Sequence, residues 1–224
     1  MRRQVAVLGL GRFGQAVARE LTRLGHDVLA IDADERIVQD LADEVTHAVQ
    51  ADVTDREALQ SLGLGDFETA IISVSGKLEA SILATVLVRE LGVKRIISKA
   101  AHELHGRILA QVGAHRVVYP ERETGVRVAH SFAAPGVQDY LDVGPGYGFA
   151  RVPVPGNWVG KTLGELNLHR TCGVTILALA RADGIMLHPS TGETLRPVDA
   201  LIVAGRDEDL ERLPSSAVGS PDGR

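Results

Sequence analysis

Three glycines at a fixed spacing are the first residues of this chain whose type and position suit a chemical task. Gly9, Gly11 and Gly14 form the pattern G-x-G-x-x-G. The first glycine permits a tight turn, the second lets the backbone approach a phosphate, and the third lets a helix pack closely on a strand. The amides at the start of the following helix then face the phosphate. The spacing therefore predicts a nucleotide-binding turn.

An acidic residue follows at the distance that such a turn requires. Asp32 lies 18 residues beyond Gly14, at the end of the apolar run 28–31. Its carboxylate is placed to accept hydrogen bonds from ribose hydroxyls and to repel a 2′-phosphate, which disfavours NADP. A lone glycine pattern is weak, because glycine turns occur in many loops that bind nothing. Strand, helix and acid together predict an adenine nucleotide or dinucleotide; a turn kept only for packing is the alternative.

Strands and helices alternate around these residues. Apolar runs without alternation, such as 5–8, are typical of strands buried on both faces of a parallel sheet. Spaced apolar residues after Gly14 predict a helix, for which Gly25 is a stop signal. The strands that we expect are 5–8, 28–31, 46–49, 70–74, 95–98 and 116–119. Six strands alternating with helices predict an α/β fold, a Rossmann-like doubly wound parallel sheet.

Three charged residues follow expected strands, where the ligands of an open parallel sheet bind. Asp52 follows the third strand and is placed either to reach adenine or ribose or to cap a helix. Lys99 follows the fifth strand and Glu121 the sixth, at the opening of a helix. A solvated lysine and a plain helix N-terminal acid are the alternatives for these two residues.

The composition changes at 131–148, where Ala-Pro-Gly and GPGYG interrupt the alternation. We expect a nucleotide-binding domain over 1–134, a linker over 135–147 and a second, smaller α+β domain over 148–214. Four short β-like runs (148–154, 174–181, 184–188 and 200–204) and a short helix near 163–166 support the second domain. The polar residues 215–224 are expected to be a disordered tail.

Composition and charge exclude several classes of protein. The chain has 224 residues, a formal charge of −5 and no dense cluster of Lys and Arg of the kind that nucleic acid requires. No apolar run approaches the roughly 18 residues of a membrane span, and the N-terminus passes directly into a strand, so we expect no signal peptide. The single cysteine, Cys172, fits a reducing compartment. A cytoplasmic protein is expected.

Longer stretches resemble the regulatory subunits of bacterial Ktr and Trk potassium transporters, most closely the Ktr type. The stretches are Gly9–Gly14, Gly25–Asp32, Ala48–Val49, Ile97–Ala100, Val112–Ala114, Tyr119–Glu121 and Gly173–Ala178. Such subunits pair a Rossmann-type RCK (TrkA-N) domain with a small TrkA-C domain. The resemblance implies a gating protein rather than an enzyme. It also implies that dimers assemble into an octameric ring on the cytoplasmic face of a membrane potassium-pore subunit, with ATP or ADP selecting between ring shapes.

The resemblance also implies roles for single residues. Arg12 matches an arginine that meets phosphates, Asp32 the ribose acid, and Lys99 a lysine near the nucleotide. Glu121 matches an acid close to the terminal phosphate and to a divalent cation, Mg or Ca, at a dimer interface. A carboxylate beside a triphosphate is unfavourable unless such a cation lies between them. The candidate cofactor-binding residues are Gly9, Gly11, Arg12, Phe13, Gly14, Asp32, Asp52, Lys99 and Glu121.

Two further sites are disfavoured. In several Ktr-type relatives the small domain binds cyclic di-AMP, but His169 stands here where relatives carry arginine. Asp52 likewise stands where some relatives have asparagine, which makes its role less secure. His102 and His105 lie at i and i+3, a spacing that could ligate zinc, but no cysteine or evident third ligand accompanies them.

An NAD-dependent oxidoreductase, or an NADH redox sensor, is the alternative on the same fold. The glycine pattern and Asp32 suit NAD as well as ATP. The second domain is small for a substrate domain, and no positioned acid–base site is evident in the sequence. Both features favour a sensor of nucleotide phosphates over an enzyme.

Overall fold

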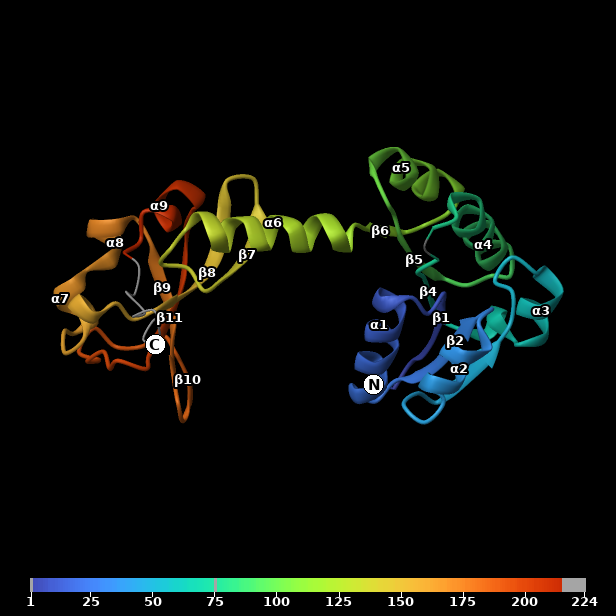
Figure 1. Ribbon diagram of the computed structural model, residues 1–224, viewed down its shortest axis with the longest axis horizontal. Helices are drawn as coiled ribbons and strands as arrows, with labels where there is room; N and C mark the ends of the chain where they lie inside the picture. The colour runs from blue at the N-terminus through green and yellow to red at the C-terminus, as the bar shows by residue number, and fades with distance from the viewer. Residues whose placement is uncertain (1, 75, 215–224) are drawn as a thin grey trace, which may run out of the picture. The chain divides into compact units, whose positions relative to one another are not determined.

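The computed structural model describes residues 2–74 and 76–214. Packing divides the chain into two units, with the division after Glu121 (Figure 1). None of the helices in the described ranges is long and apolar enough to cross a membrane.

The first unit is built on a six-stranded parallel sheet. Its strands are β1 (Gln4–Leu8), β2 (Asp27–Asp32), β3 (His47–Gln50), β4 (Thr69–Ile72), β5 (Arg95–Lys99) and β6 (Arg116–Val118). They lie in the order β3-β2-β1-β4-β5-β6. The direction of winding reverses between β1 and β4, and ligands of such sheets bind at this switch point, beyond the carboxyl ends of the strands. The predicted Rossmann-like doubly wound sheet is confirmed.

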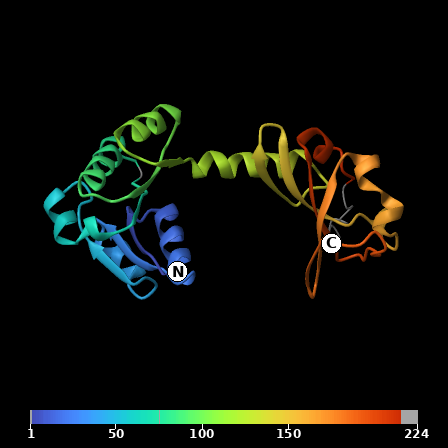
Figure 2. The ribbon, with the colours of Figure 1, turned by 180° about the vertical axis from the view of Figure 1, so that it is seen from behind.

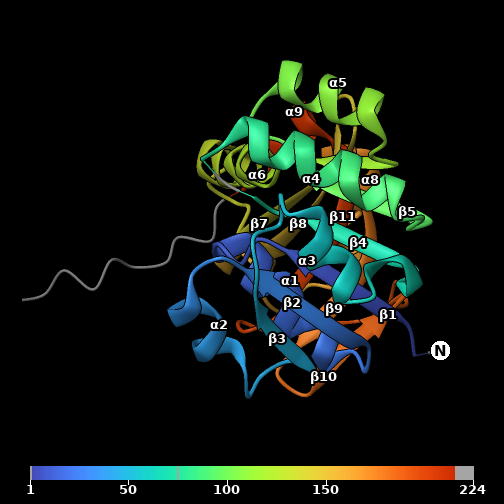
Figure 3. The ribbon, with the colours of Figure 1, turned by 90° about the vertical axis from the view of Figure 1, so that its right-hand side faces the viewer.

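Helices cover both faces of this sheet (Figures 1 and 3). They are α1 (Arg12–Arg23), α2 (Glu35–Leu41), α3 (Arg56–Ser61), α4 (Leu78–Glu90) and α5 (Glu103–Val112), with a 3₁₀ turn, η1, at Leu64–Asp66. Because side chains alternate along a strand, Val5 and Val7 pack with α1 and α2, whereas Ala6 and Leu8 pack with α3 and α4. Helices α4 and α5 lie side by side and contact each other (Figure 3).

The second unit is an antiparallel sheet with short helices. Its strands are β7 (Asp139–Gly144), β8 (Tyr147–Pro153), β9 (Thr175–Arg181), β10 (Gly184–Leu187) and β11 (Ala200–Arg206), in the order β10-β9-β11-β8-β7. The short helices are η2 (Gly156–Trp158), α7 (Leu163–Leu166), α8 (Leu168–Cys172) and α9 (Asp207–Glu211). The hairpin of β9 and β10 extends beyond the rest of the sheet (Figure 2). A smaller α+β unit was predicted, and the structure confirms it.

The connection between the predicted domains differs from the expected linker. Helix α6 (Pro120–Ala133) contains the division after Glu121 and has no buried residue. The stretch 135–147 contributes β7 to the second sheet, because GPGYG is the turn of the β7–β8 hairpin, with Gly146 at a φ of 75°. Strand β7 and helices α8 and α9 were not predicted. The domain limits 1–134 and 148–214 stay a prediction, and the expected tail lies outside the described residues.

Candidate functional site

The glycine turn passes tightly between the ends of β1 and β4. Gly9 has a φ of 89°, and a Cβ there would lie 2.8 Å from the Val74 amide nitrogen. A Cβ on Gly14 would lie 2.0 Å from the Gly9 carbonyl oxygen. Gly11 is the N-cap of α1 and supplies no side-chain hydrogen bond to the first amides of the helix. These amides of α1 are therefore suited to an anion, as the sequence predicts.

Asp32 is bound to this turn. Its Oδ2 accepts a 2.6 Å hydrogen bond from the Leu10 amide, and its Oδ1 accepts one of 2.9 Å from the Asp34 amide. A carboxylate has further acceptor capacity on both oxygens, so ribose hydroxyls could still bind. Asp32 therefore closes the glycine turn, and its contact with ribose stays a prediction.

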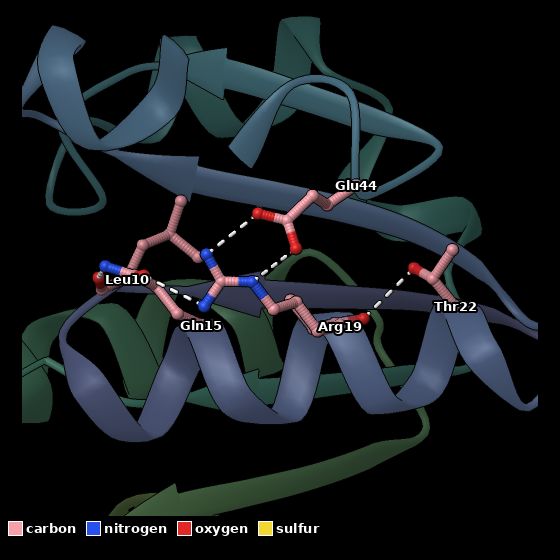
Figure 4. A network of polar contacts seen from close by, with 6 residues as sticks. Leu10, Gln15, Arg19, Thr22 and Glu44 are labelled. Carbon is pink, nitrogen blue, oxygen red and sulfur yellow. Dashed lines mark hydrogen bonds and ion pairs between the residues drawn. The ribbon is translucent and has the colours of Figure 1, made fainter. Parts of the chain in front are cut away.

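A chain of hydrogen-bonded side chains connects Leu10 of the turn to Glu44 (Figure 4). Gln15 donates from Nε2 to the Leu10 carbonyl at 2.9 Å, and Arg19 donates to Gln15 Oε1 at 3.2 Å. Arg19 also makes a bidentate pair with Glu44, with N–O distances of 2.7 and 3.0 Å, and this hydrogen bonding lowers the pKa of Glu44. Sequence reasoning missed this network. Only the i, i+4 spacing of Gln15 and Arg19 could have indicated it.

Four of the predicted residues gather beside the turn. Lys99 Nζ donates to Glu121 Oε1 at 2.6 Å and lies 5.9 Å from the ring centroid of Phe13. The Lys99 side chain is 12% exposed and that of Glu121 is 71% exposed. The hydrogen bond from Lys99 lowers the pKa of Glu121, and the charges of Lys99 and Arg12 act in the same direction. Cationic side chains thus lie near the N-terminal end of α1, with one carboxylate among them.

Asp52 lies apart from this group. Its Oδ1 accepts hydrogen bonds from the Thr54 amide at 2.8 Å and the Thr54 hydroxyl at 2.7 Å. These bonds, together with the charge of Lys77, lower the pKa of Asp52. The N-cap of α3 is Asp55, not Asp52. Thr54 and Lys77 line an open hollow of about 530 Å³ along the start of α4. The nucleotide contact expected of Asp52 stays a prediction.

Ser73 is a second residue that sequence reasoning missed. It follows β4 at the switch point and is 1% exposed. Across the described ranges its hydroxyl is one of two buried side-chain polar atoms without a hydrogen-bond partner. A Cβ on Gly14 would lie 3.2 Å from this hydroxyl, so an unpaired polar group sits directly behind the turn. Its position at the end of the predicted strand 70–74 was the available signal.

The remaining residues considered in the sequence lie in the cores of their units or at the surface. His169 is exposed on α8. Cys172 is a partly buried free cysteine that packs against the core of the second unit, as Ile176 does. His102 caps α5 by accepting the His105 amide at Nδ1, 3.2 Å away. The structure gives His102 and His105 protein hydrogen-bond partners.

Two domain families match the chain, TrkA-N over residues 5–120 and TrkA-C over residues 149–215. The chain is 35% identical over 216 residues to Ktr system potassium uptake protein A of Bacillus subtilis, covering 96% of this chain and 97% of that protein. It is 36% identical over 208 residues to Ktr system potassium uptake protein A of Vibrio alginolyticus, covering 93% and 94%.

Solved structures are similar in fold. A crystal structure of the GsuK RCK domain matches with a TM-score of 0.66 at 20% identity, over 94% of this chain and 46% of that chain. A GsuK channel bound to NAD matches with a TM-score of 0.63 at 20% identity, over 94% of this chain and 38% of that one. At this level of identity the likeness supports the fold of both units.

Proposed function

This chain belongs to the TrkA family of regulatory subunits of potassium transport, and from that premise we propose that its first unit senses ATP and ADP in order to gate a membrane potassium pore. Relatives from Bacillus subtilis and Vibrio alginolyticus are Ktr potassium uptake proteins, and the similarity extends over almost their whole length. The nucleotide acts as a signal in this proposal and is not consumed.

The contact between Lys99 and Glu121 carries the proposal. The ammonium group of Lys99 donates to the exposed carboxylate of Glu121, close to Arg12 and to the start of α1. A terminal phosphate has more negative charge than Glu121 and competes with it for Lys99. A diphosphate reaches less far and leaves the pair intact. ATP and ADP then differ in their contacts with one element, which is the requirement for a ligand to shift a conformational equilibrium.

Glu121 offers one carboxylate ligand to a divalent cation. Mg²⁺ is commonly held by one or two carboxylates together with the phosphates of a nucleotide. In the ranges that the structure describes, no three residues of the types His, Cys, Asp and Glu come together as a metal cage. Glu121 could therefore hold a cation only together with nucleotide phosphates, and the cation would screen the repulsion between the carboxylate and a triphosphate.

A second function is supported by Asp32. Backbone amides hold its carboxylate beside the turn, and these bonds do not depend on which phosphate group is bound. This arrangement suits NAD as well as ATP. An NADH-responsive sensor is therefore the competing proposal. Cyclic di-AMP is not included, because His169 replaces the expected arginine.

For assembly, we propose an octameric ring on the cytoplasmic face of the pore subunit. The support is the similarity to Ktr uptake proteins over nearly their full length. Light scattering of the full chain is expected to give the mass of eight copies, and copurification with a Ktr-type or Trk-type pore subunit tests the partner. A chain that stays monomeric with and without ATP contradicts the ring.

Thermal unfolding of the full chain with ATP, ADP, NADH or cyclic di-AMP tests the ligand. A ligand that binds only the folded state raises Tm. We expect ATP and ADP to raise Tm more than NADH. The variant Arg12→Ala should weaken ATP binding more than ADP binding. Stabilisation by NADH alone would contradict an ATP/ADP sensor, and equal losses for ATP and ADP would contradict the role of Arg12.

A further inference from the structure

A buried polar cluster lies between α4, α5 and the end of β5, outside the residues that face the glycine turn. At its centre is His105 of α5, which is 3% exposed. Its Nε2 lies 2.8 Å from Ser81 Oγ of α4, and its Nδ1 accepts the backbone amide of Ala101 at 3.2 Å. Helices α4 and α5 contact each other (Figure 3), so the ring joins both helices to the chain that follows β5.

The hydrogen bonds fix the protonation state of this ring. A backbone amide can only donate, so Nδ1, which accepts from Ala101, has no proton. The single proton of the neutral ring is therefore on Nε2 and is donated to Ser81 Oγ. Ser81 donates in turn to the Leu78 carbonyl at 3.0 Å. Protonation of Nδ1 would place an N–H group against the Ala101 N–H group and break that bond.

The same cluster fixes the chain on both sides of Lys99. Before Lys99, the Ser98 hydroxyl is 3.1 Å from Thr85 Oγ1, and Thr85 donates to the Ser81 carbonyl at 2.8 Å. After Lys99, the Ala101 amide is held by His105. Contacts with α4 and α5 therefore add to the pairing with β6, through Lys99 and the Ala100 amide, in holding the backbone that carries the Lys99 side chain.

We propose that His105 is a positioning residue of the nucleotide site: its neutral ring holds the end of β5 so that Lys99 reaches the nucleotide phosphates, and its protonation releases that strand end. The inference rests on the function proposed above. It makes nucleotide binding sensitive to acid through a group that touches no nucleotide.

The surroundings of His105 favour the neutral ring at neutral pH. Burial lowers the pKa of His105, and the nearby charge of His102 lowers it further; the two ring centroids are 6.0 Å apart. Tyr119, which follows β6, lies against Gly106, the next residue of α5. The ionisable groups on the surrounding elements are, on or beside α4, Lys77, Glu79, Arg89 and Glu90, on β5, Arg95 and Lys99, on or beside α5, His102, Glu103 and Arg107, and, after β6, Tyr119.

Calorimetric titration of the full chain with ATP, in wild type and His105→Asn, tests the inference. The Asn side-chain oxygen can accept the Ala101 amide but does not titrate, so the variant should bind ATP normally near pH 7.5. Between about pH 7.5 and 5.5 the ratio of the wild-type Kd to the H105N Kd should rise severalfold but by less than about tenfold, because ATP binds best when the His105 ring is neutral and the lowered pKa of that ring limits its protonation at pH 5.5. Comparison at each pH cancels the titration of ATP itself. A constant ratio would overturn the inference.

Two more variants test whether His105 positions the chain beside Lys99 or only stabilises the folded protein. His105→Gln keeps a donor for Ser81 but loses the acceptor for Ala101, so it should bind ATP several-fold more weakly than H105N at neutral pH. His102→Asn removes the neighbouring histidine and keeps an N-cap, and it should retain the acid sensitivity. If H105Q and H105N bind equally, or if H102N abolishes the pH dependence, His105 does not have this role.

A measurement without nucleotide keeps the inference testable if H105N does not fold. In wild type, the NMR signals of the Ala101 and Lys99 amides should shift with the same pKa as the His105 ring. Amides that do not follow that titration would overturn the inference. A chain that binds none of ATP, ADP and NADH at any pH would instead contradict the proposed function, whatever the amides do.

Discussion

The backbone amide of Leu10 donates a 2.6 Å hydrogen bond to Asp32 Oδ2, which joins the glycine turn after β1 to the end of β2. The acid expected to bind ribose thus has a structural task before any nucleotide arrives. Leu10 is fully buried, so its amide cannot turn to water when the carboxylate is absent. Asp32 therefore couples the shape of the phosphate-binding turn to the group that meets the sugar.

Asp32→Ala should weaken nucleotide binding and destabilise the protein. The Leu10 amide loses its partner, and an unsatisfied buried donor costs about 1–3 kcal/mol. Urea unfolding without nucleotide measures this loss. Asp52→Ala is the matched control, because Asp52 is exposed and its side chain accepts hydrogen bonds from nearby Thr54. The loss in free energy of unfolding for this variant should stay within about 0.5 kcal/mol. Equal losses for the two variants would show that Asp32 does not hold the turn.

Gly14→Ala should disrupt the turn, because the new Cβ would lie 2.0 Å from the Gly9 carbonyl oxygen, so the backbone must move. We expect the loss of most ATP binding and a loss of stability of about 1–3 kcal/mol, as for other overpacked sites. The control is Gly125→Ala, within α6, where the Cβ meets no atom within 4 Å. In that variant the free energy of unfolding should increase by roughly 0.5–1 kcal/mol, because alanine has a higher helix propensity than glycine. If G14A binds ATP as wild type does, the glycine turn is not part of the ATP-binding site.

Tyr140 gives the second unit a dependence on alkaline pH. Its hydroxyl donates to Asp207 at 2.7 Å, and burial together with this contact raises its pKa well above 10.0. The unfolded chain loses this proton near pH 10 while the folded chain keeps it, so stability falls as pH rises through and beyond 10. At pH 8, Tyr140→Phe should lower the free energy of unfolding by about 1 kcal/mol. Between pH 8 and 11, the free energy of unfolding of this variant should fall less than that of wild type. Tyr147→Phe, at a half-exposed position, is the control; the same pH slope in wild type and Y140F would contradict the assignment.

The predictable parts of this protein are those whose cause is local in the sequence. The glycines and Asp32 follow from the backbone geometry of one strand–turn–helix unit, and the six strands follow from continuous apolar runs. Helix α7 was found at 163–166, where Thr162 and Glu165 form a capping box. Helix α8, by contrast, has only five residues and begins after Asn167 at a φ of 42°. Too few residues are present there for a helical period to be recognised.

The parts that escaped sequence reasoning depend on tertiary contacts. The partner of Arg19 is Glu44, which is far away in the sequence and is brought close only by the packing of α1 with α2. The unpaired hydroxyl of Ser73 has meaning only because Gly14 lies in front of it. The pairing of Lys99 with Glu121 likewise requires adjacent β5 and β6. Sequence identified both residues as candidates but not their contact.

The contact between Lys99 and Glu121 predicts a specific dependence on divalent cations. Without Mg²⁺, Glu121→Gln should bind ATP about two- to fivefold more tightly than wild type, because the competing carboxylate is gone and an exposed ion pair is worth about 0.2–1 kcal/mol. Addition of Mg²⁺ should strengthen ATP binding to wild type more than to E121Q, since the cation loses its protein carboxylate. Lys99→Met should weaken ATP binding in both conditions.

Calorimetric titration with ATP and ADP, each with and without Mg²⁺, measures these effects. Because ADP is expected to leave the pair intact, E121Q should change ADP binding less than twofold, a difference below about 0.4 kcal/mol. Glu123→Gln, two residues further along α6, is the matched control for the loss of one negative charge on this helix. If E123Q reproduces the effect of E121Q, the gain reflects net charge alone. If E121Q binds ATP no more tightly without Mg²⁺, Glu121 does not compete with the nucleotide for Lys99.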